Sequence, residues 1–541
     1  MHIAIVPAGH NRGLLCRVRQ DGAASVQMSQ DLGETVKMYE AEDSPRWIVA
    51  SLADSYPQLL ADGVSLTRAH DVALTEAVLL PAEQRSGSPD LESAYARLYG
   101  HPPPPHAHQP EQQTLFDEGL DPQDTMARLI EVYSAQVQRL QRTGLRYLAA
   151  CESAGGLVAA EMSHAGLPWR TNVHDEFLRG LLGPPPAPGL RPRKLQQLAD
   201  QVSDAFGRPL NPDSPQQIID AFRRAGHPVS TTRARELKEL SHAAVAPLLR
   251  YKELARIYSA HGWNWARTWI SDGPEGPRSP AKRFRPRYVV GGVVTGRWAT
   301  DGGAALQIPQ ALRAAIAADE GWRLVAADAA QLEPRILAAM SGDAGMTAAS
   351  AQHDMYAALA PTFGGSRGDA KLAMLSAMYG GTAGNATHLL HVLRRRYPDA
   401  YSYVTSAAKA GERGEQVSTW LGRQCPAVDD GWWTRLAGSD GSRHARHRGR
   451  FTRNFVVQGT AAEWSLVFMA LLRRQLRADG IGELVFYQHD EFIVHCRAAH
   501  AHRVAALFQE TADATTTTLF DGTKVRIPLD AKIVRSYSEV K

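Results

Sequence analysis

Cysteine is scarce in this sequence, and the few cysteines are scattered. There are four in 541 residues, at Cys16, Cys151, Cys425 and Cys496, and no two of them form a CxxC pair. Zinc sites and disulfide frameworks need cysteines at close, regular spacings, so both are excluded as the basis of this fold. The same scarcity is typical of a reducing compartment, and a cytoplasmic location is expected.

Long apolar runs are also missing. Charged or amide residues interrupt every apolar run within a few positions, and no stretch reaches the roughly 18 apolar residues of a membrane span. The first residues lack a basic segment followed by an apolar core, so no secretory signal is expected. The sequence therefore predicts no membrane partner.

Acidic residues are absent from the beginning of the chain, where the first is Asp21. The net charge of the whole chain is +4 at pH 7, which permits nucleic-acid binding without demonstrating it. Arginine and histidine concentrate in one stretch, residues 435–453, which includes Arg443, Arg446, Arg448 and Arg450. Two interpretations of this stretch remain open, a solvated surface loop and a phosphate-binding face.

The pattern of apolar residues predicts a mixed α/β protein with several domains. The chain is long enough for about three domains of ordinary size. Strands are predicted in the first 100 residues at 2–6 and 46–51, and helices at 72–80 and 91–98. A proline-rich segment over residues 101–123, HPPPPHAHQP at its start, is predicted to be a linker.

The remainder divides into a helical region and a mixed region. Residues 124–285 are predicted to be mainly helical, with helices at 126–149, 234–240 and 247–257. Further on, strands are predicted at 288–294, 323–327, 484–487 and 491–495, and helices at 369–378, 386–395 and 460–478. The predicted domains in this part span residues 286–345, 346–455 and 456–541.

Asp328 ends the first of three segments that could carry chemistry. An apolar strand leads into it, and a helix begins a few residues later, with Pro334 suited to the first helical turn. A carboxylate fixed at the end of a buried strand is a good ligand for a hard cation. A lone aspartate in this place can equally be a helix cap, so this segment leaves both readings open.

The second segment is a helix with a basic and aromatic side. Lys371 follows Arg367 by four residues and Tyr379 follows Lys371 by eight, so all three fall on one side of a helix. Such a side could bind a triphosphate and stack on a base. An ordinary surface helix would look the same.

The third segment places Asp490 and Glu491 between two apolar strands. Aspartate is common in turns, so an ordinary turn is one interpretation. A divalent metal is the other, because buried flanking strands make an unpartnered charge costly. Together the three segments supply the parts for two-metal phosphoryl transfer.

These segments resemble, in order, the motifs of the DNA polymerase I group, family A. The resemblance covers DAAQLEPR at residues 328–335, Arg367-x3-Lys371-x7-Tyr379 and His489-Asp490-Glu491. Further similar stretches are TGR at 295–297, LQIP at 306–309, GRFTRNFVVQGTAA at 449–462 and LLRYKEL at 248–254. In wording, the chain is most similar to actinobacterial proteins labelled bifunctional 3′–5′ exonuclease/DNA polymerase.

The resemblance implies a right-hand polymerase fold with palm, fingers and thumb, and a template-directed DNA polymerase active in repair or gap filling. It implies a monomer whose partners are primer–template DNA, through which it associates with the nucleoid, and deoxynucleoside triphosphates. Two Mg²⁺ ions, with Mn²⁺ as the expected substitute, would be held by Asp328, Asp490 and the carbonyl of Ala329. The remaining roles fall to two groups. The expected nucleotide contacts are Arg367, Lys371, Tyr379, Glu333, Leu375, Gln331 and His489, with Lys371 as the proton donor to pyrophosphate. The expected DNA contacts are Arg297, Arg335, Arg450, Asn454, Gln458 and His489.

The sequence also departs from the family pattern. Ala329 and Leu375 stand where aromatic residues are usual, which predicts looser selection of the sugar. The first 100 residues resemble the family's exonuclease domain, but the first predicted strand carries no carboxylate, so proofreading is expected to be absent. Asp90 and Glu92 are predicted to be structural. The alternative function is a catalytically weak, polymerase-shaped protein that binds primer–template DNA.

Overall fold

The computed structural model describes the whole chain except residues 10, 19–23, 103–120, 274–281, 382–385 and 541. Most of the predicted linker, residues 103–120, therefore lies outside the described residues. The described chain forms two compact units. The first unit combines Met1–Ala165, Arg287–Thr300 and Val325–Ile533, and the second combines Gly166–Pro286, Asp301–Leu324 and Val534–Lys541.

The helical region predicted at 124–285 is divided between these units. Its first two helices, α5 (Pro122–Thr143) and α6 (Arg146–Ala165), belong to the first unit. They replace the single helix predicted at 126–149, because Gly144 adopts a left-handed conformation and ends α5. The rest of the region belongs to the second unit.

A five-stranded sheet forms the beginning of the first unit, in the order β3-β2-β1-β4-β5. Its strands are β1 (His2–Pro7), β2 (Gly13–Val18), β3 (Ala24–Ser29), β4 (Arg46–Val49) and β5 (Arg68–Asp71). β1, β4 and β5 run parallel, and β1, β2 and β3 are antiparallel neighbours. The strands predicted at 2–6 and 46–51 are confirmed. The hairpin of β2 and β3 was not predicted.

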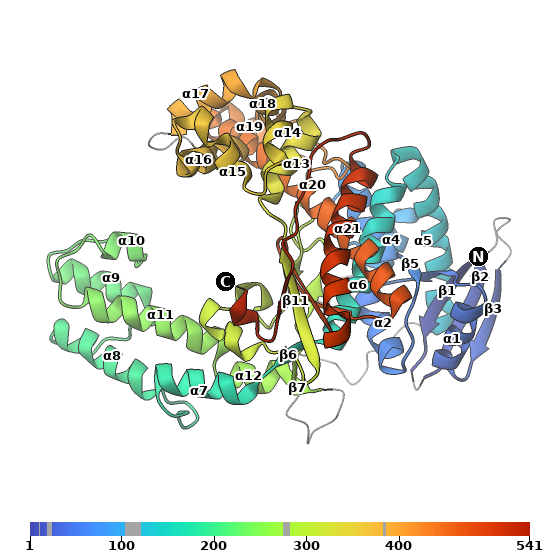
Figure 1. The fold of residues 1–541 in the computed structure, drawn as a ribbon, viewed down its shortest axis with the longest axis horizontal. Helices are drawn as coiled ribbons and strands as arrows, with labels where there is room; N and C mark the ends of the chain where they lie inside the picture. The colour runs from blue at the N-terminus through green and yellow to red at the C-terminus, as the bar shows by residue number, and fades with distance from the viewer. Residues whose placement is uncertain (10, 19–23, 103–120, 274–281, 382–385, 541) are drawn as a thin grey trace. The chain divides into compact units, whose positions relative to one another are not determined.

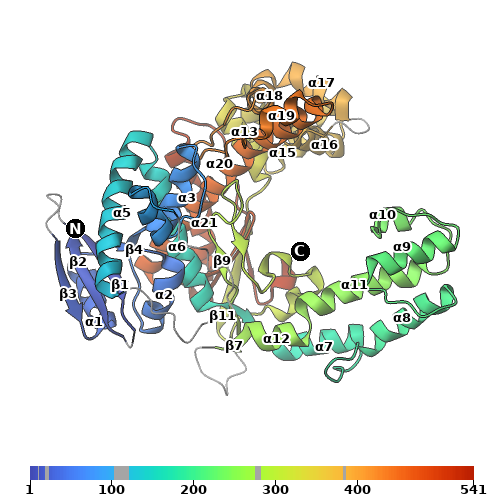
Figure 2. The same cartoon turned by 180° about the vertical axis from the view of Figure 1, so that it is seen from behind.

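Helices cover both faces of this sheet (Figure 2). They are α1 (Leu32–Glu42), α2 (Leu52–Ala61), α3 (Val72–Ala82), α4 (Leu91–Leu98) and α5. Ile3, Ile5 and Trp47 pack on one face with residues of α1 and α2. Ala4 and Ile48 pack on the other face with residues of α5. This alternation follows from the two-residue period of a strand.

A second sheet, most of whose residues belong to this unit, has the order β12-β13-β11-β14. Its strands are β11 (Trp322–Asp328), β12 (Glu483–Gln488), β13 (Glu491–Arg497) and β14 (Lys532–Val534). β12 and β13 form an antiparallel hairpin. The strands predicted at 323–327, 484–487 and 491–495 are confirmed. Residues from α20 (Gly441–Asp479), α21 (Ala501–Leu519) and α13 (Leu332–Ser341) bury the apolar side chains of this sheet.

Helix α20 is longer than predicted, because it begins at Gly441 rather than near residue 460. Most of the basic stretch 435–453 is therefore helical, and the surface-loop interpretation is wrong. Within the described chain, α20 is the one helix long and apolar enough to cross a membrane, with a mean hydropathy of 1.5 over its best 18 residues. The sequence was expected to contain no such stretch. Since 83% of that window is buried in protein, its apolar surface is accounted for by the core.

The remaining helices and strands of the first unit come from residues 288–300 and 344–437. They are α14 (Ala344–Ser350), α15 (Met355–Leu359), α16 (Arg367–Tyr379), α17 (Ala386–Arg396), α18 (Pro398–Glu412), α19 (Trp432–Ala437), β9 (Tyr288–Val289) and β10 (Ala299–Thr300). The strand predicted at 288–294 is reduced to β9, because Gly291 has a φ of +61° and turns the chain.

The second unit is mainly helical, and its helices α7 to α11 are green in Figure 1. Its helices are α7 (Thr171–Leu182), α8 (Arg193–Ala205), α9 (Pro215–Arg224), α10 (Ala234–Leu237), α11 (Val245–His261) and α12 (Trp263–Trp269). A small antiparallel sheet has the order β6-β8-β7, formed by β6 (Leu167–Trp169), β8 (Lys282–Phe284) and β7 (Ile270–Asp272). The helices predicted near 234–240 and 247–257 are confirmed as α10 and α11.

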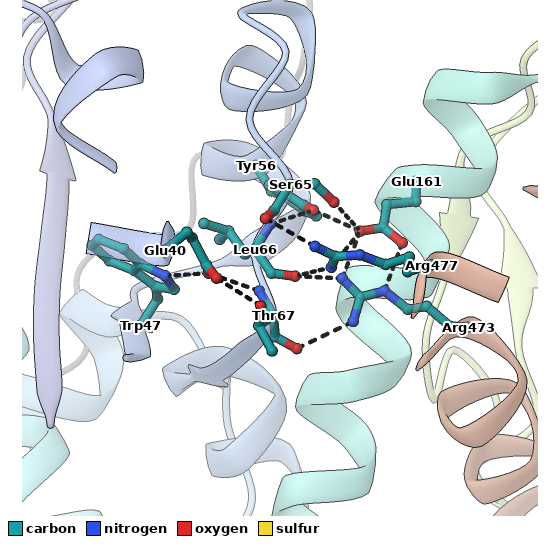
Figure 3. A network of polar contacts seen from close by, with 9 residues as sticks. All are labelled: Glu40, Trp47, Tyr56, Ser65, Leu66, Thr67, Glu161, Arg473 and Arg477. Carbon is teal, nitrogen blue, oxygen red and sulfur yellow. Dashed lines mark hydrogen bonds and ion pairs between the residues drawn. The ribbon is translucent and has the colours of Figure 1, made fainter. Parts of the chain in front are cut away.

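A polar network ties the first sheet to α6 and α20 (Figure 3). The Glu161 carboxylate on α6 accepts hydrogen bonds of 2.6 Å from Tyr56 of α2 and from Arg473 of α20. Arg473 also donates to the carbonyls of Leu66 and Thr67, which precede β5. Arg473 is nine-tenths buried, so solvent screens these hydrogen bonds only weakly.

Candidate functional site

Asp328 and Asp490 lie at one edge of the second sheet. Asp328 is the last residue of β11, and Asp490 lies in the turn between β12 and β13, the strand next to β11. The backbone N–H of Ala329 donates to the carbonyl of Asp490 over 2.9 Å, which fixes the two backbone segments side by side. The sequence could not show that these two segments are neighbours, since 161 residues lie between Asp328 and Asp490.

Asp328 does not cap the following helix. The residue before α13 is Gln331, which has a φ of +46° and makes no capping hydrogen bond. Asp490 does lie in a tight turn, in which His489 has a φ of +60°. The turn and the ligand interpretations of Asp490 are therefore compatible with each other. The cap interpretation of Asp328 is wrong.

The two carboxylates fit a magnesium site in their chemistry. Their oxygens are hard donors, and Mg²⁺ is commonly bound by one or two carboxylates together with water and substrate phosphates. Within the described residues, no group of three or more His, Cys, Asp or Glu side chains could hold a metal. Remaining ligands would thus come from the backbone, such as Ala329, from water and from substrate.

Glu333 lies in the first turn of α13 and connects two other predicted residues. The Tyr379 hydroxyl donates to the Glu333 carboxylate over 2.6 Å. Arg297 forms an ion pair with the other oxygen of the same carboxylate. Burial raises the pKa of Tyr379, and the negative charge of Glu333 raises it further, so Tyr379 stays protonated and keeps its hydrogen bond.

A cavity of about 140 Å³ opens beside these residues. Six of the predicted site residues line it, together with Leu332, Pro334, Tyr356, Met378, Ala461 and Ala462. The six are Arg297, Gln331, Glu333, Leu375, His489 and Asp490. Burial, and then the positive charge of Arg297, lower the pKa of His489, so His489 is neutral at pH 7. The cavity is too small for a whole nucleotide and suits a sugar-sized group.

Helix α16 presents the two predicted phosphate ligands to solvent. Ser366 caps its first turn by accepting from the N–H of Asp369, and Gly380, with a φ of +73°, ends it after Tyr379. Arg367 and Lys371 are exposed. Arg367 pairs with Asp354 over 2.6 Å, so a phosphate would have to take the place of that carboxylate.

Two residues near α16 were not predicted. Asp354 holds Arg367, and the Arg367 guanidinium lies 5.8 Å from the centre of the Tyr356 ring, which lines the cavity. The sequence DMYAAL gives only a helix cap as a signal, because Asp354 caps α15. A role beside the site depends on the fold.

Arg450, Asn454 and Gln458 follow each other at four-residue spacing on α20 and therefore share one side. Gln458 accepts a hydrogen bond of 2.9 Å from the Thr295 hydroxyl. A side chain at Gly380 would come within 2.6 Å of Arg450, so the end of α16 lies against this helix. The predicted DNA contacts are thus brought next to the predicted nucleotide contacts.

The loop that carries Arg297 rests on a buried ion pair. Gly296 has a φ of +85°, and a side chain there would come within 2.7 Å of Arg423. Arg423 pairs with Glu152 of α6, and both are buried. Nearby, burial raises the pKa of Glu463 to about 7, although Thr419 and the N–H of Leu421 donate to it. The Arg423–Glu152 pair thus lies against the loop, and neither residue lines the cavity.

Arg335 corrects one prediction. It was expected to contact DNA, but it is fully buried. Its guanidinium donates to the carbonyls of Ala330, Ser350, Gln352, His353 and Arg526. Gln331 is also engaged in the protein, where it accepts from the N–H of Met355 over 3.0 Å. Arg335 is a structural residue that joins three segments of the chain.

Ala329 and Leu375 differ from each other in what surrounds them. Ala329 is buried in the core, between Asp490 and an isolated bridge to Leu529. Leu375 is half-buried and lines the cavity. An aromatic ring at residue 375 would fill part of that space. Its replacement by leucine leaves the space open, which agrees with the predicted looser selection of the sugar.

The sheet with its two carboxylates and the basic helix α16 define a right-hand polymerase fold. A solved structure described as the POL domain of Pol1 from M. smegmatis, in complex with DNA primer-template and dNTP, matches with a TM-score of 0.75 and 18% identity. The match covers 99% of this chain and 95% of that one. The family model described as DNA polymerase family A matches residues 191–539, and the chain belongs to DNA polymerase family A.

Curated relatives agree with this family. DNA polymerase I of Chloroflexus aurantiacus is 28% identical over 361 residues, which cover 59% of this chain and 37% of that protein. The thermostable DNA polymerase I of Thermus thermophilus is 26% identical over 360 residues, 59% of this chain and 41% of that protein. DNA polymerase I of Pseudomonas aeruginosa is 26% identical over 347 residues, which cover 56% of this chain and 36% of that protein. The chain thus matches less than half the length of these relatives.

Proposed function

We propose that the protein is a template-directed DNA polymerase that adds deoxynucleotides to a primer 3′ end by two-metal phosphoryl transfer. One observation carries the proposal: Asp328 and Asp490, far apart in sequence, come from adjacent strands joined through Ala329. A pair of carboxylates fixed on rigid strands is what a two-metal site needs. Membership of DNA polymerase family A supports it.

Asp328 and Asp490 would hold two Mg²⁺ ions, with the carbonyl of Ala329 as a further ligand. When bound, the ions supply activation of the primer 3′-hydroxyl and neutralisation of the charge on the triphosphate. The chain's own contribution is rigidity, because both carboxylates stand where a strand ends and neither lies on a long loop.

Arg367 and Lys371 would bind the triphosphate. Both are exposed on the same side of α16, and their positive charges suit phosphate oxygens. Arg367 would exchange its ion pair with Asp354 for the phosphate. Lys371 would deliver a proton to the departing pyrophosphate.

The duplex would be followed by Arg297, Arg450, Asn454, Gln458 and His489. Arg450, Asn454 and Gln458 share one side of α20, and such a row of polar side chains suits the sugar–phosphate backbone, whose contacts position without reading sequence. Arg335 is not part of this set, since it is buried.

Primer extension on a templated hairpin with four deoxynucleotides and Mg²⁺ tests the proposal. The polymerase reading expects addition of the templated bases. The alternative, a polymerase-shaped protein that binds primer–template DNA with little catalysis, expects duplex binding without extension. The same assay on gapped and blunt substrates tests the proposed role in gap filling, which requires faster extension into the gap.

Glu333 is proposed to exclude the ribose 2′-hydroxyl, because it lies at the cavity and is held by Tyr379 and Arg297. A filled pocket rejects an added hydroxyl by contact. We predict that deoxynucleotides are preferred, with measurable ribonucleotide insertion because Leu375 leaves space. Glu333→Ala should relax the preference by at least about tenfold, or ~1.4 kcal/mol. Single-nucleotide insertion efficiencies for matched deoxy- and ribonucleotides measure this.

The matched control is Glu320→Ala, which removes an exposed glutamate outside the cavity and should leave the ratio unchanged. An unchanged ratio in Glu333→Ala would show that another residue excludes the hydroxyl. A fall in insertion of both sugars alike would assign Glu333 to binding rather than to selection.

The first sheet is proposed to have no proofreading activity. β1 carries no carboxylate. Asp90 caps α4 by accepting from the N–H of Ser93, and Glu92 pairs with Arg128, which supports the predicted structural role of both. The buried Asp71 is likewise engaged, since it accepts from the N–H groups of Leu52 and Leu74.

We therefore predict no Mg²⁺-dependent 3′→5′ shortening of single-stranded or mispaired primers. The measurement uses 5′-labelled primers without deoxynucleotides, in the protein with Asp328→Ala, so that pyrophosphorolysis cannot contribute. Shortening that persists in this variant and stops on adding EDTA would contradict the prediction and place metal ligands elsewhere in the chain.

A further inference from the structure

A basic row crosses the first sheet at the start of its parallel strands. His2, Arg46 and Arg68 are the first residues of β1, β4 and β5. The strand registers pair His2 with Arg46 and Arg46 with Arg68. Residues paired across strands point to the same face of a sheet, so the three side chains share one face.

This face is the one that α5 covers. Ala4 and Ile48, each two residues beyond a member of the row, belong to the apolar core packed against α5. The side chains facing α5 thus change from apolar to basic at the end of the sheet. Arginine is almost never fully buried unless it is paired, so the basic end of this face needs either solvent or an anionic ligand.

A cavity of about 710 Å³ lies over His2 and Arg46, two of the three members of the basic row. His2, Arg46 and His70 line it from the sheet, Tyr133 from α5 and Arg146 from α6. The rest of the wall includes apolar side chains of α5 and alanines of α6. Sites for small molecules commonly have volumes of about 300–1,000 Å³ and pair an apolar wall with a few polar groups.

The cavity carries positive charge without acidic compensation. Among the described residues, no carboxylate lies within ion-pairing distance of Arg46, Arg68 or Arg146, and no carboxylate lines the cavity. Within the described chain, the Arg46 guanidinium donates one hydrogen bond, to the carbonyl of Ala69 over 2.8 Å. A guanidinium has five N–H donors, so Arg46 has donors left for an anion.

An aromatic ring stands beside these charges. The Tyr133 ring lies 6.0 Å from the His2 ring and 4.9 Å from the His70 ring, centre to centre. Burial raises the pKa of Tyr133, while the charges of Arg46 and Arg146 act to lower it. Both arginines line the cavity together with Tyr133. A planar ligand with a phosphate would meet a ring and two arginines together.

We propose that this cavity binds a nucleoside phosphate, with the phosphate between Arg46 and Arg146 and the base against Tyr133. Guanidinium groups suit phosphate oxygens, and tyrosine rings suit the faces of bases. The absence of carboxylates from its lining separates it from a metal-dependent nuclease site. It also stands apart from the proposed polymerase site, with which it shares no lining residue.

The test measures binding of ADP by equilibrium dialysis, in EDTA and in protein carrying Arg367→Ala and Lys371→Ala. These changes remove nucleotide binding at the proposed polymerase site. Arg46→Gln and Arg146→Gln are each expected to weaken ADP binding by about tenfold or more. Arg142→Gln is the matched control, because Arg142 is an exposed arginine in the last turn of α5 and does not line the cavity. It should leave binding unchanged.

A second arm replaces ADP by a four-nucleotide single strand with a 5′ phosphate, which presents the same chemistry at a strand end. Binding of either probe that depends on Arg46 and Arg146 supports the proposal. The tighter-binding probe shows whether the phosphate comes from a free nucleotide or from a strand end. Arg146→Gln guards against misfolding, because Arg146 is exposed. Absence of saturable binding of both probes at millimolar concentration, or binding indifferent to both substitutions, would overturn it.

Discussion

Primer extension should fall by at least about 10³-fold, or ~4 kcal/mol, when Asp490 or Asp328 is replaced by alanine. The two carboxylates are the proposed metal ligands at the edge of the second sheet, and neither can take the other's place because each is fixed by its own strand. Single-turnover extension of a labelled hairpin primer with the next templated deoxynucleotide measures the effect.

Binding of duplex DNA should be retained in both variants, because the proposed duplex contacts on α20 do not involve either aspartate. Asp490→Asn keeps the shape of the side chain and removes its charge, so it should lose extension as the alanine variant does. Asp521→Ala removes an exposed aspartate away from the cavity and should extend normally. If either Asp328→Ala or Asp490→Ala extended primers at near the normal rate, that residue would not be a metal ligand.

Arg335→Met should destabilise the first unit by at least ~4 kcal/mol. The methionine fills similar volume but leaves the five carbonyls that Arg335 satisfies, and each buried polar group without a partner costs about 1–3 kcal/mol. Burial lowers the pKa of Arg335 to about 10, which still leaves it charged at pH 7. The midpoint of urea unfolding, read by circular dichroism, gives the change in stability.

Arg474→Met is the control, since Arg474 is an exposed arginine on α20 with no requirement for burial. Its unfolding midpoint should stay within the error of the wild type. Arg335→Lys keeps the charge but has fewer donors, so it should fall between the two and remains measurable if the methionine variant is insoluble. Equal midpoints for Arg335→Met and Arg474→Met would show that the carbonyls find other partners, water included.

The sequence predicted the strands that carry the two aspartates because both strands are short, apolar and bounded by turns. It left open whether Asp328 capped a helix, and that question needed the backbone of Gln331. The neighbourhood of Glu333 and Tyr379 was implied by the family resemblance, and their hydrogen bond is present. Local pattern therefore located the parts, while the contact between them depended on the order of strands in the sheet.

Arg335 shows why the remaining residues could not be predicted. In the sequence it is an arginine in a helical turn beside the site residues, and arginines are rarely fully buried. Its burial depends on segments near residues 350 and 526, which only the tertiary fold brings to it. The basic stretch 435–453 was ambiguous for the same reason. Charged residues suit a loop and the exposed start of a long helix equally, until the buried half of α20 is seen.

Helix α6 has a consequence for how the first unit unfolds. Its Leu157 and Ala160 complete the core of the first sheet, while its Val158, Ala159 and Met162 belong to the core of the second. Glu161, between them in sequence, holds Arg473. A fluctuation that exposes either sheet must therefore disturb the same helix. The first sheet is accordingly part of one cooperative unfolding unit with the sheet that carries the two aspartates.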